Sequence, residues 1–96
     1  MVVRFFIDPE TGVPHIDNHD VAPSEVLEVL RGPSDHGPGR DGSRVAEGQT
    51  LQGRYLRVIY KEDERDGSLF VITAFDLSGK AKAAFRRRRK RKRRGS

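Results

Sequence analysis

Two apolar runs separated by a polar turn are the feature that most constrains the fold of this chain. Residues 54–60 and 69–75 are each about a strand long and rich in β-branched and aromatic side chains. The polar residues between them, 61–68, include the turn dipeptide Asp66-Gly67. This pattern predicts an antiparallel β-hairpin.

The hairpin also predicts where the core lies, because side chains alternate between the two faces of a strand. Leu56, Val58 and Tyr60 fall on one face of the first strand and make it apolar, whereas the other face is mixed. The second strand is apolar on both faces. It is therefore expected in the interior of a sheet, covered on both sides.

Signals on either side of the hairpin predict the other elements of one small domain. A helix over Pro23–Arg31 has proline at its first position, and Val26, Leu27 and Leu30 form its apolar stripe, with Val29 beside it. The remaining predicted elements are a strand over residues 1–7, a short helix over 14–18 with Ile16 facing inward, a mobile loop rich in Gly and Pro over 32–42, a strand over 44–50, and a last helix after Ser78. The predicted fold class is α/β (α+β), with an antiparallel sheet of about four strands packed with two N-terminal helices and a C-terminal helix.

The C-terminal residues differ sharply in charge from the rest of the chain. Residues 86–94, here called the basic run, are nine consecutive Lys or Arg, whereas the other residues include 10 Lys or Arg and 14 Asp or Glu and carry a formal charge of −4. Like charges one helical turn apart repel each other, so the last helix is expected to fray within the basic run. A chain of 96 residues encloses one core. We therefore expect a domain over residues 1–85 and a basic, disordered tail over 86–96.

Composition also limits the partners that the chain can have. It has no cysteine, no secretory signal and no apolar run long enough to cross a bilayer, which favours a cytoplasmic protein without a membrane partner. The basic run is either a solvated terminus or a contact with the phosphates of a polyanion, and we favour contact with RNA or the ribosome. The predicted contacts in this run are Arg86, Arg87, Arg88, Arg89 and Lys90.

A few polar residues in the body have side chains suited to phosphodiester chemistry. His15 and His19 are four residues apart, as in a two-histidine metal site, but no third ligand is evident, and neither a metal site nor a cofactor is predicted. Arg44, Arg54 and Arg57 lie in or beside predicted strands, where arginine is ordinarily an edge or solvent-facing group. If they converge with His19, their guanidinium groups would bind phosphate oxygens while the imidazole moves protons. Tyr55 or Tyr60 would add a hydroxyl or a stacking surface.

Several segments of the chain resemble a known family. The sequence HIDNHDV at residues 15–21, followed by the helix predicted over 23–30, resembles the N-I-x-K-H-G-V segment and succeeding helix of BrnT-type toxins. Residues 41–48, 54–60 and 70–75 are similar to the same toxins and to the related DUF4258 domains. The resemblance implies a RelE-like domain that acts as a metal-independent endoribonuclease of a type II toxin–antitoxin system, inhibited by a cognate antitoxin protein.

The resemblance also implies roles for individual residues. It matches His19 to the histidine of the first toxin segment and Arg44 to the arginine that opens the second strand. For the mechanism we expect His19 as the acid or base, Arg44 with Arg54 as the phosphate clamp, and Arg57 and Tyr60 as further substrate contacts. Phe75 stands where BrnT-type toxins have an arginine at the end of the last strand. The alternative is a non-catalytic RNA-binding or protein-interaction module on the same fold. The enzymatic hypothesis requires that His19 and Arg44 meet in one water-accessible hollow.

Overall fold

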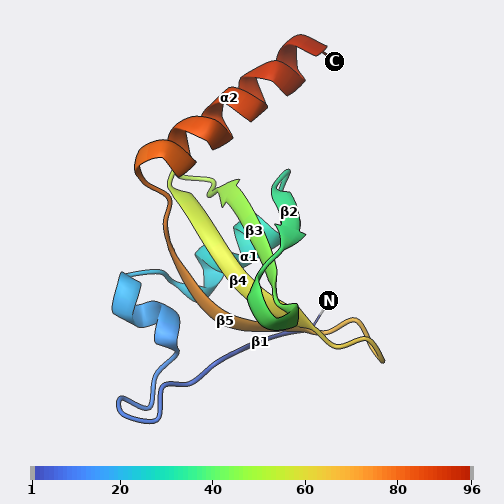
Figure 1. Cartoon of the computed structure of the whole chain (residues 1–96). Helices are drawn as coiled ribbons and strands as arrows, with labels where there is room; N and C mark the ends of the chain where they lie inside the picture. The colour runs from blue at the N-terminus through green and yellow to red at the C-terminus, as the bar shows by residue number, and fades with distance from the viewer. Residues whose placement is uncertain (1, 96) are drawn as a thin grey trace.

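In a computed structural model the chain forms a five-stranded mixed sheet with the strand order β1-β5-β4-β3-β2 (Figure 1). The structure describes residues 2–95, with side chains described as far as residue 91; Met1, expected in the first strand, and Ser96, expected in the tail, lie outside the described residues. Strand β1 is parallel to β5, and the other neighbours are antiparallel. The elements are β1 (Val3–Phe5), the 3-10 turn η1 (His15–His19), α1 (Pro23–Arg31), β2 (Asp35–Pro38), the 3-10 turn η2 (Arg40–Gly42), β3 (Arg44–Gln49), β4 (Tyr55–Glu62), β5 (Leu69–Asp76) and α2 (Gly79–Gly95).

The predicted hairpin is confirmed as β4 and β5. Gly67 closes the turn in the left-handed region, with φ at 73°, and the Asp63 N–H donates to the Ser68 carbonyl at 2.8 Å. Strand β5 lies between β1 and β4, so its predicted interior position is confirmed. The expected cover on both faces is wrong, because Phe70, on the face away from the core, is 37% exposed. The expected number of strands is wrong by one. Strand β2 forms inside the segment predicted to be a mobile loop, because its backbone pairs with β3 from Asp35 to Pro38.

The two helices predicted near the N-terminus are the 3-10 turn η1 and the α-helix α1. The predicted helix α1 has the expected bounds, and the Glu25 carboxylate accepts a hydrogen bond from the Ala22 N–H at 3.0 Å. Its fully buried residues are Val26 and Val29, whereas Leu27 was expected in the apolar stripe. Val29 can pack against β3 because Gly48 on that strand has no side chain. A Cβ at position 48 would lie 3.1 Å from Cγ1 of Val29.

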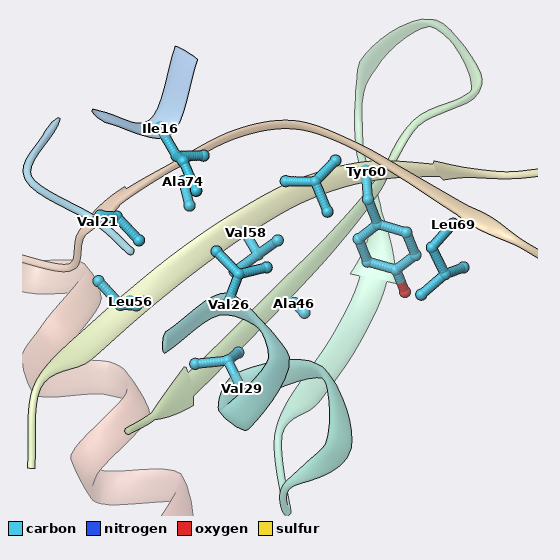
Figure 2. Packing of buried hydrophobic residues seen from close by; sticks show 11 residues of the cluster. Ile16, Val21, Val26, Val29, Ala46, Leu56, Val58, Tyr60, Leu69 and Ala74 are labelled. Atoms are coloured by element: carbon cyan, nitrogen blue, oxygen red, sulfur yellow. The ribbon is translucent and has the colours of Figure 1, made fainter. Parts of the chain in front are cut away.

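The core lies between the sheet and α1, which is behind the sheet in Figure 1. Figure 2 shows the cluster, in which Leu56, Val58 and Tyr60 are buried as the strand pattern predicts. Ile16 of η1 joins the same cluster and is also buried as predicted. The opposite face, here called the open face, carries Tyr55, Arg57 and Ile59 of β4 and Phe70, Thr73 and Phe75 of β5. Helix α2 approaches this face at one end of the sheet (Figure 1), and His19 of η1 contacts Phe75 on it.

Helix α2 continues through the basic run to Gly95, where fraying and a disordered tail were expected. The expected boundary at residue 85 falls inside this helix. Phe85, only 2% exposed, anchors it by packing on the Tyr55 ring at 5.8 Å between centroids. Carboxylates of the body neutralise part of the charge, which relieves the repulsion that the sequence pattern predicts. Within the described residues, no helix is long and apolar enough to span a bilayer.

Candidate nucleic-acid interface

Helix α2 has two sides with different surroundings. Its inward side contacts the sheet through Phe85, and the Lys82 ammonium lies 5.0 Å from the centroid of the Tyr55 ring. A cation this close to an aromatic face is attracted by the ring quadrupole. These contacts fix the first two turns of α2 on the start of β4 and so determine the direction in which the basic run points.

The inward arginines of the basic run bind carboxylates of β2 and β3. Arg88 donates from Nε to Asp35 Oδ2 at 2.8 Å and from Nη2 to Glu47 Oε1 at 2.9 Å. Arg89 donates to the other oxygen of Asp35 at 3.2 Å, and Arg57 on β4 donates to Glu47 Oε2 at 2.7 Å. The hydrogen bond to Asp35 raises the pKa of Arg88 above its usual value. Arg57, Arg88 and Arg89, predicted to bind substrate, therefore already hold partners in the chain itself.

The outward side of α2 presents cations without such partners. Arg86, Arg87, Lys90 and Arg91 are exposed, and none of them forms an ion pair with a carboxylate in the part of the chain that is described. A groove of about 570 Å³ runs between α2 and the sheet, and it is lined by Gln49, Tyr55, Ala83, Phe85, Arg86, Arg87, Arg89 and Lys90. This part of the predicted RNA contact is open to a ligand.

A second groove of about 560 Å³ crosses the open face near β2 and β3. Its lining mixes the ion-paired Asp35, Glu47, Arg57 and Arg88 with Arg40 and with apolar side chains. The charges there largely compensate each other, so this groove attracts a phosphate less than the outward side of α2 does.

Arg54, predicted as a phosphate clamp, is instead the centre of an internal network. Its guanidinium binds both oxygens of Asp76, at 2.7 and 3.0 Å, and Glu25 Oε1 at 3.0 Å. It also donates to the carbonyls of His19 and Asp20 at 3.1 and 2.6 Å. The hydrogen bond from Arg54 lowers the pKa of Asp76 below its usual value. Arg54 thus ties η1 and α1 to the end of the sheet and has no donor left for a phosphate.

The structure does not bring His19 and Arg44 together. The His19 ring packs on Phe75 at 6.0 Å, and Phe75 pairs across the sheet with Arg57 on the open face. Arg44 pairs with Tyr60, three residues further along β4 and on the core side of the sheet. The two sites are therefore separated by three residues along the strand direction, which is about 10 Å, and by the two strand spacings from β5 to β3, which is also about 10 Å. The shared hollow that the enzymatic hypothesis requires does not form.

The residue that sequence reasoning missed near Arg44 is His36. Its Nδ1 lies 2.9 Å from the Tyr60 hydroxyl, which passes across β3 to reach β2. Tyr60 itself is 5% exposed, so it is not the open substrate contact that was predicted. No sequence signal marks His36, because it lies in the Gly- and Pro-rich segment and its partner is 24 residues away.

His15 and His19 form an aromatic pair, with ring centroids 5.7 Å apart at an interplanar angle of 69°. Nδ1 of His15 is 3.6 Å from Asp8 Oδ2, and the pKa of Asp8 is lowered, mainly by the hydrogen bond from the Glu10 N–H. Among the described residues, no group of three or more metal-ligating side chains comes together.

No protein-family model matches the chain, and none of the curated proteins or solved structures compared with it is significantly similar. The chemistry of the site therefore follows from its own residues. The exposed cations of α2 are suited to phosphate oxygens, since a guanidinium donates paired hydrogen bonds to them. They carry no arrangement that would read a base sequence.

Proposed function

We propose that this protein binds RNA through the phosphate backbone, with α2 as a rigid basic edge. The observation that carries the proposal is the division of the basic run into two sides. The inward arginines are held by Asp35 and Glu47, while Arg86, Arg87 and Lys90 are exposed. A cation already fixed in position loses less side-chain and backbone entropy on binding than one in a disordered tail.

The spacing of the exposed cations supports binding to a polyanion. Arg86 and Lys90 are four residues apart on one helix, so they lie within about 6 Å of each other. Their mutual repulsion is reduced when phosphates approach, and the counterions released from the nucleic acid add to the affinity. The net charge of the rest of the chain is negative, so attraction to RNA would come from this helix.

The proposal is tested by the salt dependence of RNA binding. Fluorescence anisotropy with a labelled 12-nucleotide RNA compares the wild type with Arg86→Gln/Arg87→Gln. Each lost phosphate contact lowers the slope of log affinity against log salt by about 0.7 for a single strand, so the double variant should lose about 1.4. Arg31→Gln/Arg65→Gln removes the same charge from exposed positions of the body and should leave the slope unchanged. An equal effect in both variants would refute a contact at α2.

The endoribonuclease activity implied by the resemblance to BrnT-type toxins is a second candidate function. It is favoured by the hydrogen bond between the Tyr60 hydroxyl and His36, since Arg44 pairs with Tyr60 in the sheet. RNA cleavage without a metal needs a proton-transfer group and a cation near the phosphorane. In this version His36 takes the role first assigned to His19.

RNA degradation in EDTA separates the two functions. A nuclease of this kind should lose activity in Arg44→Ala and in His36→Ala, whereas Arg31→Ala should cleave like the wild type. If the wild-type protein binds RNA but the RNA stays intact after incubation, the endoribonuclease activity is refuted and RNA binding remains as the proposed function.

The resemblance to BrnT-type toxins suggests the remaining parts of the proposal. An α+β sheet with an N-terminal helix on one face and a C-terminal helix supports the proposal of a RelE-like domain, and the cytoplasm is its proposed location. The ribosome and a cognate antitoxin are then the proposed partners. Growth arrest on expression, relieved by co-expression of the neighbouring reading frame, would be the expected sign of both toxin and antitoxin.

A further inference from the structure

Five aromatic rings form a continuous strip along the edge of β5. Phe70 contacts Phe6 with ring centroids 6.5 Å apart, and Phe6 contacts His15 at 6.2 Å. The ring centroids of His15 and His19 are 5.7 Å apart, and those of His19 and Phe75 are 6.0 Å apart. We call these residues the aromatic strip. Phe6 and Phe70 are large apolar side chains that remain 39% and 37% exposed.

The aromatic strip forms because β1 and η1 together cover the outer edge of β5. Strand β1 pairs with β5 only from Leu69 to Val71, so the second half of β5 is covered by η1. The chain returns from β1 to η1 through a bridge between Ile7 and Pro14, and this brings the histidines of η1 beside Phe6. In Figure 1, η1 lies beside β5, and no helix lies over the open face between them and β2.

Basic side chains flank both phenylalanines of β5. In the sheet register Phe70 pairs with Arg4 on β1 and with Lys61 on β4, and Phe75 pairs with Arg57. Paired residues point to the same face, so these cations lie beside the rings on the open face. Arg4 and Lys61 are exposed, and each ring thus has a positive neighbour.

We infer that the aromatic strip is a stacking platform for the bases of single-stranded RNA. The inference rests on the proposed RNA-binding function and adds the class of RNA. Unpaired bases stack on aromatic side chains while neighbouring cations hold the phosphates, and this combination is how proteins bind single strands without reading their sequence. A duplex keeps its bases stacked inside, so it could use α2 but not the strip.

The dimensions of the open face suit a strand of several nucleotides. Arg57 and Lys61 are four residues apart on β4, so the rings paired with them are separated by about 13 Å. Tyr55, two residues before Arg57, packs against α2, which places the exposed cations of the helix at the Phe75 end of the strip. Bases on the strip and phosphates along the exposed cations of α2 would therefore belong to one continuous strand.

Charge argues for RNA as the occupant of this apolar surface. The charged strand residues facing this side are Arg4, Arg57 and Lys61, together with Glu47 and Asp35, whose charges are paired with Arg57, Arg88 and Arg89. Asp8 is the carboxylate beside the strip, 3.6 Å from His15. An apolar patch bordered by positive charge is complementary to a ligand that offers flat rings joined by phosphates.

The test compares a single-stranded 12-nucleotide RNA with a 12-base-pair RNA duplex by fluorescence anisotropy. Phe6→Leu/Phe70→Leu keeps apolar volume and removes two rings, and it should weaken single-strand binding about fivefold or more for each base that loses its stack, with duplex binding unchanged. Phe6→Tyr/Phe70→Tyr keeps the rings and should bind like the wild type. Leu51→Ala, at a side chain that is 88% exposed and outside the strip, is the matched control and should have no effect.

A direct readout of stacking accompanies the affinities. A 2-aminopurine placed in the single strand should lose fluorescence on binding to the wild type and keep it on binding to Phe6→Leu/Phe70→Leu. Equal binding of single strand and duplex, or wild-type binding by the leucine variant, would overturn the platform and assign the rings to a protein partner. These results would leave RNA binding through α2 intact, whereas the absence of any RNA binding would remove the proposed function itself.

Discussion

Replacement of Arg54 by methionine is the most informative single change for the stability of this fold. Arg54 donates five hydrogen bonds from its side chain, to both oxygens of Asp76, to Glu25 and to the carbonyls of His19 and Asp20. These partners come from η1, the segment before α1, α1 itself and the end of β5. Methionine keeps the apolar stem and removes every donor, so the variant isolates the guanidinium.

The magnitude follows from the exposure of the network. A hydrogen bond to a charged group contributes about 1.5–3 kcal/mol when it is buried. The Arg54 side chain is 26% exposed and that of Asp76 is more than half exposed, so solvent screening reduces the value for each bond. We expect a loss of about 2–4 kcal/mol in the free energy of unfolding. For a domain of this size the melting temperature should fall by roughly 10–25 °C.

The pH dependence of this loss has a definite sign. The pKa of Asp76 in the folded protein lies below its usual value of 3.8, and the hydrogen bond from Arg54 is the first cause. A carboxyl whose pKa is lowered by folding stabilises the protein above the unfolded pKa, and this contribution disappears as the pH falls through the folded value. The difference in melting temperature between wild type and Arg54→Met should therefore be full at neutral pH and shrink below about pH 3.8.

Differential scanning calorimetry or circular dichroism measures the two melting temperatures across this pH range. Arg65→Met is the matched control, because it makes the same chemical change at a side chain that is 92% exposed. The ion pair of Arg65 with Asp63 is long, at 3.5 Å. The control should change stability by less than about 0.5 kcal/mol. Equal melting temperatures for the two variants at pH 7 would refute the structural role of Arg54 and return it to the list of candidate phosphate ligands.

Three further changes test the packing of the fold. Gly48→Ala should destabilise the protein by about 1–3 kcal/mol in urea denaturation, because a Cβ would press on α1 and the loop after it, whereas Gly37→Ala, with open space at that position, should be close to neutral. Phe85→Ala should release α2 from the sheet and accelerate tryptic cleavage of the basic run at least tenfold; unchanged cleavage would mean that the ring is not the anchor. Tyr60→Phe should cost about 0.5–1.5 kcal/mol by removing the hydrogen bond to His36, and no loss on thermal melting would show that the bond is not formed in solution.

The elements that could be predicted are those with a strong local pattern. The hairpin of β4 and β5 combines alternating apolar residues with an Asp-Gly turn, and α1 combines proline at its start with an apolar stripe. These signals lie within about ten residues of the structure that they specify. The choice of Val29 over Leu27 for the buried side of α1 could not be predicted, because it depends on Gly48, about twenty residues later in the chain and directly beneath Val29.

Strand β2 and the length of α2 could not be predicted, because both depend on partners distant in sequence. Strand β2 has almost no β-forming residues and exists through its backbone pairing with β3. The expectation that α2 frays considered only repulsion within the basic run. It omitted the carboxylates of Asp35 and Glu47, which are more than forty residues from Arg88 in the chain and directly bonded to it in the fold.

The candidate site divides in the same way. The sequence predicts that the basic run contacts phosphates, with a solvated terminus as the alternative, because nine adjacent cations attract a polyanion. It could not separate the arginines that bind the body from those that remain exposed. It also could not distinguish Arg54, which is saturated by internal partners, from a substrate ligand, since exposed and internal arginines have the same local pattern.

By itself the sequence determined an α+β domain around one hairpin, an N-terminal helix on the core side, and a C-terminal concentration of positive charge. The tertiary structure alone decided that His19 belongs to an aromatic strip rather than to a site with Arg44, and that Arg88 and Arg89 of the basic run are paired with Asp35 and Glu47. The physical reason is that patterns along the chain report short-range geometry. Ion pairs, ring contacts and strand register join residues whose separation in sequence carries no signal of their proximity.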